Sequence, residues 1–139
     1  MRAVFELDDD EADAMITAAI AAAKALGIRV SVAVVDRGGR LKRFARMDGA
    51  EVAGTTLAQH KAFSALANSC STHELARDAQ PGGSLYGIAS SGAGEFTIVG
   101  GGAVVVHDGD VVAGVGVSGG TAEQDRECAE AAVAEVPAN

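Results

Sequence analysis

Residues that can bind an anion or transfer a proton occur at three places in this sequence. At the first, Arg46, Met47 and Asp48 place a fork-shaped cation, a soft thioether and a carboxylate side by side, and an arginine can clamp a carboxylate through paired hydrogen bonds. At the second, His60 and Lys61 are neighbours in a helical stretch, where both can serve as an acid or a base. The alternatives are a salt bridge that only holds the Arg46 loop, and an ordinary surface lysine at position 61.

The third place is the glycine-rich stretch VVAGVGVSGGTAEQD, which begins at Val111. Gly114 to Gly119 matches G-x-G-x-x-G, but too little chain follows for the βαβ unit that a dinucleotide site requires. Backbone amides at the start of the following helix can instead accept an anion. The residues of this predicted anion site are Gly119, Gly120, Thr121, Gln124 and Asp125. The alternative is a plain helix cap, because the T-x-x-Q spacing forms a capping box.

Length and composition limit the possible functions. The 139 residues, 48% of them apolar, predict one globular domain over 1–139. The net charge of -8 and the dispersed basic residues argue against nucleic acid as a partner. The N-terminus is acidic and no apolar run is long enough for a membrane span, so we expect a cytoplasmic protein without membrane contact. Cys70 and Cys128 have no metal-like spacing, and we expect free thiols and no metal site.

Hydrophobic periodicity and turn signals predict the elements that must position these residues. Helices are expected from the Asp8 cap to Gly27, over Glu51–Asn68, from Ser71 or Thr72 to Arg77, and from Thr121 to Val136. Strands are expected over Ile28–Val35, Leu41–Phe44, Phe96–Val99, Ala103–His107 and Val111–Val117. Hairpin turns at 36–39 and 108–109 make the pairing antiparallel. The order of the elements predicts an α+β fold, a five-stranded antiparallel sheet covered by helices.

The order and spacing of four motifs point to a known family. VAVVDRGGRLKRFARMDGA, HKAFSA, PGGSLYG and GVSGGTAEQD follow one another along the chain. From about Asp10 to Val136 the sequence resembles the GlcG/HbpS-like haem-binding family, which also occurs as the C-terminal domain of some corrinoid adenosyltransferases. The resemblance implies a profilin-like α/β/α sandwich around a five-stranded antiparallel sheet, and a homo-oligomer between a dimer and an octamer. It does not imply one activity: some members of that family bind haem and some are linked to haem degradation or redox sensing, while many have no established chemistry. Haem is therefore the leading candidate cofactor, in haem handling or redox sensing.

The choice of a haem ligand depends on the histidines, because haem iron is usually held by His, Met, Cys or Tyr. His60 is the best axial candidate because it adjoins Lys61, whereas His73 and His107 are expected near a helix start and a solvated turn. Met47 and Tyr86 are weaker options. Gly82, Gly83 and Tyr86 of PGGSLYG belong to a long irregular segment that we expect to form a wall or lid of the site. The low aromatic content of 4% leaves few rings to enclose a porphyrin.

Three functions therefore remain open. The first is a small-ligand-binding protein with haem as the leading ligand. The second is a metal-free catabolic enzyme, of isomerase, lyase or hydrolase type, acting on a small carboxylate or carbonyl compound. In that enzyme Arg46 would hold the substrate, while Lys61, His60 or Asp36 would serve as acid and base. The third is a structural or regulatory oligomer without a ligand.

Overall fold

The computed structural model describes residues 1–139 as an α+β fold with four α-helices and a four-stranded antiparallel sheet. The strands run in the order β2-β1-β4-β3. The elements are α1 (Asp9–Leu26), β1 (Ser31–Val35), β2 (Leu41–Arg46), α2 (Val52–Asn68), α3 (Thr72–Asp78), β3 (Gly102–His107), β4 (Asp110–Ser118) and α4 (Ala122–Val133). The predicted α+β class and the antiparallel pairing are confirmed.

Helix ends follow the predicted chemistry closely. The Asp8 side chain accepts a hydrogen bond from the Glu11 amide at 2.8 Å, and the Glu11 side chain accepts one from the Asp8 amide. The helix ends at Gly27, whose φ of 72° is readily adopted by glycine. Thr121 and Gln124 form the second capping box, at the start of α4. Both predicted boxes are therefore confirmed.

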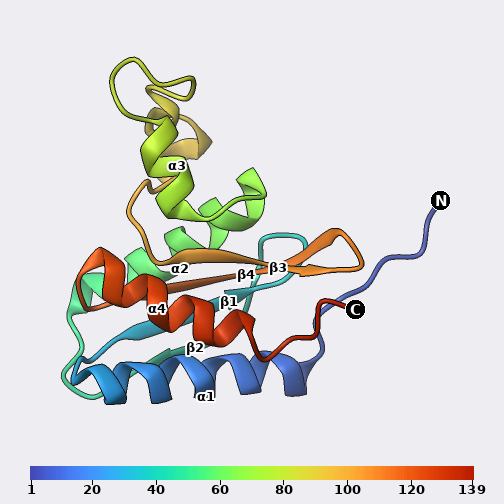
Figure 1. Cartoon of the computed structure of the whole chain (residues 1–139), viewed down its shortest axis with the longest axis vertical. Helices are drawn as coiled ribbons and strands as arrows, with labels where there is room; N and C mark the ends of the chain where they lie inside the picture. The colour runs from blue at the N-terminus through green and yellow to red at the C-terminus, as the bar shows by residue number, and fades with distance from the viewer.

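Helices lie against both faces of the sheet (Figure 1). Val32 and Val34 of β1 belong to the main core of 16 buried residues, which packs under α1 and α4. Ala33 and Val35 alternate to the opposite face and form a smaller core with α2. The sheet therefore has two apolar faces, and α2 covers one of them.

The glycines of the G-x-G pattern allow this close packing. A Cβ on Gly116 would collide with the Ala58 carbonyl, and a Cβ on Gly114 would collide with the Ala62 carbonyl. Both carbonyls belong to α2, so the two glycines let the helix backbone approach the middle of β4. Their role is helix-to-sheet contact, in keeping with the absence of a βαβ unit.

The predicted strand at Phe96–Val99 is wrong, and the sheet has four strands instead of five. The backbone of this segment bonds to α2 instead of a neighbouring strand. Ser64 Oγ accepts a hydrogen bond from the Thr97 amide at 2.8 Å and lies 3.3 Å from the Glu95 carbonyl oxygen. Phe96 stacks on Phe63, with ring centroids 5.9 Å apart. The apolar run reflects packing on a helix.

The chain from α3 to β3 projects from the rest of the molecule (Figure 1). It holds two short 3-10 turns, Ile88–Ser90 and Gly92–Gly94, and otherwise lacks regular structure. Leu85 is 38% exposed and Tyr86 is 70% exposed. The predicted long irregular segment is confirmed. None of the helices combines the length and the apolar character that a membrane crossing needs.

Candidate functional site

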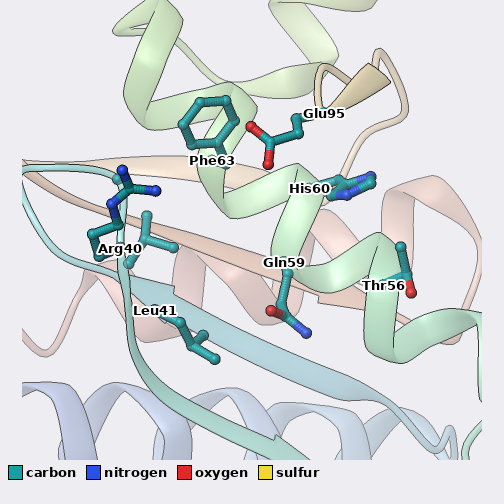
Figure 2. A pocket seen from close by; sticks show the side chains of 9 residues that line it. Arg40, Leu41, Thr56, Gln59, His60, Phe63 and Glu95 are labelled. Carbon is teal, nitrogen blue, oxygen red and sulfur yellow. The ribbon is translucent and has the colours of Figure 1, made fainter. Parts of the chain in front are cut away.

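A pocket of about 320 Å³ lies beside α2, between the β1–β2 turn and the segment that precedes β3 (Figure 2). We call it the α2 pocket. Its lining residues are Val35, Gly39, Arg40, Leu41, Thr56, Gln59, His60, Phe63 and Glu95. Its volume is at the lower end of the range for ligand pockets, about 300 to 1,000 Å³.

Four lining residues come from α2, at spacings that place them on one side of a helix: Thr56, Gln59, His60 and Phe63. The imidazole of His60 is half-buried and has no hydrogen-bond partner in the protein. Gln59 donates from Nε2 to the Thr55 carbonyl at 3.0 Å, which leaves its side-chain oxygen free. This side of α2 therefore presents an uncommitted imidazole beside an amide oxygen.

The β1–β2 turn holds Arg40 at the pocket. Asp36 Oδ1 accepts hydrogen bonds from the amides of Gly38 and Arg40, at 2.9 and 3.0 Å. Gly39 has a φ of 79°, and a Cβ there would lie 3.0 Å from the Phe63 ring. Asp36, a predicted acid or base, therefore orders the turn that carries Arg40. The guanidinium of Arg40 itself is exposed and forms no ion pair.

Glu95 reaches the pocket from the segment anchored at Ser64 and Phe96. Its carboxylate points toward the centre of the lining residues in Figure 2, with Arg40 on the other side. No cation lies within ion-pair distance of Glu95. The α2 pocket therefore has an unpaired cation and an unpaired anion on its walls.

Lys61 points to the sheet side of α2, away from this pocket, and is only 2% exposed. Its Nζ donates to the Val117 carbonyl at 2.9 Å and to Asp125 Oδ2 at 3.0 Å. Gly101 packs over the ammonium, because a Cβ there would lie 3.0 Å from Nζ. The Lys61–Asp125 pair ties α2 to the start of α4 and is enclosed by protein.

The predicted anion site at the start of α4 is occupied by the chain's own groups. Asp125 Oδ1 accepts a hydrogen bond from the Gly120 amide at 2.8 Å, and Gln124 Oε1 accepts one from the Thr121 amide at 3.0 Å. Gly119 lies so close to Arg29 that a Cβ would collide with the Arg29 carbonyl. Asp125 is thus the anion at this helix N-terminus. A ligand role for these residues stays a prediction.

Arg46, Met47 and Asp48 lie outside the α2 pocket. Arg46 is exposed at the end of β2. Met47 packs against the main core, and its sulfur accepts a hydrogen bond from the Val30 amide at 3.4 Å. The Asp48 carbonyl accepts one from Arg29 at 2.8 Å. The side chains of these three sequence neighbours therefore do not converge on one site.

Gly82, Gly83 and Tyr86 belong to the projecting segment and do not line the pocket. His107 packs edge-on against Phe5 and lies 2.8 Å from the Pro137 carbonyl oxygen through Nδ1. His73 lies near Ser71 Oγ, in a second groove of about 500 Å³ beside α4. Of the three histidines, His60 alone lines the α2 pocket.

Both cysteines are free thiols, as predicted. Burial, with the charges of Asp125 and Glu127, raises the pKa of Cys128 to about 11. Burial also raises the pKa of Cys70, with smaller effects from Glu74 and Asp78. The thiols therefore stay protonated at neutral pH. No three His, Cys, Asp or Glu side chains are placed to hold a metal ion together.

Several pocket residues were not singled out from the sequence. Thr56, Gln59 and Phe63 share the helical spacing of His60, so the helix pattern contained the signal. Arg40 follows a recognised turn, but its direction depends on Asp36. Glu95 had no signal in the sequence. Its position depends on how the segment before β3 packs on α2, through the hydrogen bonds of Ser64 and the stacking of Phe96 on Phe63.

Comparison with known proteins places this geometry in context. The model of a family described as haem degrading protein HbpS-like matches residues 7–134. An uncharacterized 15.0 kDa protein from the dhaT-dhaS intergenic region of Citrobacter freundii is 45% identical over 113 residues, which are 80% of each chain.

Two further similarities involve proteins called PduO. The corrinoid adenosyltransferase PduO of Citrobacter freundii is 36% identical over 130 residues, which are 94% of this chain and 39% of PduO. The chain thus spans well under half of that relative. A crystal structure described as a PduOC:heme complex superposes with a TM-score of 0.91 at 36% identity, covering 95% of this chain and 96% of the other.

Proposed function

Because the chain belongs to the HbpS-like family of haem-degrading proteins, we propose that it binds haem, and that the α2 pocket is the binding site. The observation that carries the proposal is the uncommitted imidazole of His60 in the same pocket as the unpaired guanidinium of Arg40. The similarity to a protein crystallised with haem supports the choice of ligand.

The residues present fit the chemistry of haem. His60 would supply an axial nitrogen ligand, since neither ring nitrogen is engaged by the protein. Arg40 would bind a propionate through charge-assisted hydrogen bonds. Val35, Leu41 and Phe63, which line the pocket, would supply apolar contacts for the macrocycle. Haem bound here would provide an iron centre whose properties depend on the axial ligand and its surroundings.

The modest size of the pocket implies that haem would remain partly exposed to solvent. Apolar surface continues from the pocket along α2, because Val52 lies one helical turn before Thr56 and is 81% exposed. We propose further that the domain is profilin-like and assembles with copies of itself into an oligomer between a dimer and an octamer. Its role would be in haem handling or redox sensing. We assign Lys61 and Asp125 a structural role, because they are enclosed and paired.

The location of the site is tested by titrating the protein with haemin and following the Soret absorbance. Arg40→Gln should weaken binding by about tenfold, the effect of losing one charge-assisted interaction. Arg46→Gln is the matched control, since Arg46 is also exposed and unpaired but lies outside the pocket. Equal affinity of the two variants would place haem elsewhere, and an unsaturable wild-type titration would reject haem binding.

A further inference from the structure

We infer that the α2 pocket also binds a small zwitterion, an α-amino acid with an apolar side chain, as a ligand distinct from haem. The arrangement that points to this class is the presence of Arg40, Glu95 and an apolar wall around one volume of about 320 Å³. Each feature matches one part of such a molecule.

The carboxylate of the ligand fits Arg40. Five of the chain's arginines are engaged in salt bridges, namely Arg2, Arg37, Arg43, Arg77 and Arg126. Arg40 has no such partner although its turn is fixed by Asp36. A guanidinium on an ordered turn can bind a carboxylate through two parallel hydrogen bonds with little loss of backbone freedom.

The ammonium group fits Glu95 and its neighbours. The Glu95 carboxylate faces the pocket without a cation of its own (Figure 2). Its backbone is held in place, because Ser64 bonds to the segment on both sides of Phe96. The free side-chain oxygen of Gln59 and the hydroxyl of Thr56 line the same pocket and can accept further N–H donors.

Opposite charges that line one pocket without forming an ion pair leave room for a molecule that carries both. Haem has carboxylates but no ammonium, so Glu95 has no complement in that ligand. The apolar wall of Val35, Leu41 and Phe63 fits an aliphatic or aromatic side chain. The pocket can enclose a whole molecule of amino-acid size, whereas haem would extend beyond it into solvent. The two ligands would compete, because they share Arg40.

The test is an NMR titration of the isotope-labelled protein with L-leucine. Isocaproate lacks the ammonium group and isoamylamine lacks the carboxylate, so each should bind at least about tenfold more weakly than leucine. Arg40→Gln and Glu95→Gln should each weaken leucine binding by about tenfold or more. The matched controls are Arg46→Gln and Glu51→Gln, exposed residues outside the pocket, which should bind leucine as the wild type does.

Haemin titrations of the same variants separate this inference from the proposed function. Glu95→Gln should weaken leucine binding without weakening haemin binding, whereas His60→Ala should weaken haemin binding and leave leucine binding unchanged. Leucine binding without haemin binding would support the inference and overturn the haem proposal. Absence of leucine binding, equal binding of isocaproate, or full leucine affinity in Glu95→Gln would overturn the inference, whatever the haemin result.

Discussion

At the scale of single residues, this protein uses basic side chains in two opposite ways. Lys61 is buried and pairs with Asp125, whereas Arg40 is exposed on an ordered turn and unpaired. Burying a charge is costly unless it is paired and hydrogen-bonded, so the first arrangement serves the fold. An unpaired charge at a pocket is available to a ligand, and we propose that the second arrangement serves binding.

Lys61→Met should destabilise the protein by about 3 to 5 kcal/mol, because it leaves the buried Asp125 carboxylate without its cation. Urea unfolding measures the loss. Adding Asp125→Asn should restore part of the stability, since a neutral amide oxygen can still accept from the Gly120 amide. A double variant less stable than Lys61→Met would show that the charge of Asp125 is not the cause.

The raised pKa of the buried Cys128 thiol predicts that the folded protein loses stability at alkaline pH. Burial raises its pKa from 9.0 to about 11, so between these values the thiol ionises in the unfolded chain but stays protonated in the folded one. The contribution of this protonated thiol to the free energy of unfolding is fully present below pH 9.0 and is lost as the pH rises toward 11. Unfolding free energies at pH 8 and 10 should fall more for the wild type than for Cys128→Ala. Parallel losses would contradict this assignment.

At the scale of elements, short sequence patterns correctly predicted those features that depend only on neighbouring residues. The capping boxes at Asp8 and Thr121 and the hairpin turns are confirmed because each depends on residues a few positions apart. The fifth strand at Phe96–Val99 failed because its hydrogen bonds go to Ser64, far away in sequence. In the candidate site, too, local features could be predicted from the sequence and contacts between distant residues could not. The position of His60 on α2 was predictable, but the approach of Glu95 was not.

The start of α4 tests whether GVSGGTAEQD is a cap or a ligand site. Thr121→Ala should cost about 1 kcal/mol of stability through loss of the cap. Haemin affinity should stay unchanged, because the amides of this turn already bond to Asp125 and Gln124. Melting and binding are measured on the same variant. A loss of affinity beyond the effect of the control Arg46→Gln would restore the predicted ligand role.

At the scale of the whole molecule, two helical layers enclose the sheet, while the chain between α3 and β3 projects outward (Figure 1). Apolar side chains on this projection and next to β3 are exposed, including Tyr86 at 70% and Val99 at 47%. Exposed apolar surface of this kind favours contact with another protein surface. We expect an oligomer to bury two surfaces, the projecting segment and the start of α2 at Val52.

Static light scattering should therefore give a mass above the 13.9 kDa of one chain. Because the surfaces concerned are apolar, the association should persist at high salt, where screened charge contacts weaken. Tyr86→Ser is expected to lower the mass or weaken the association. A protein that stays at 13.9 kDa at high micromolar concentration would contradict the predicted assembly.

The central claim, that His60 in the α2 pocket is the haem ligand, is tested most directly by the Soret spectrum of three histidine variants. His60→Ala should shift the Soret band and weaken haemin binding, because it removes the axial nitrogen. His107→Ala and His73→Ala should keep the wild-type spectrum, since neither residue lines the pocket. A wild-type spectrum and affinity in His60→Ala, or loss of binding in His73→Ala alone, would contradict the claim.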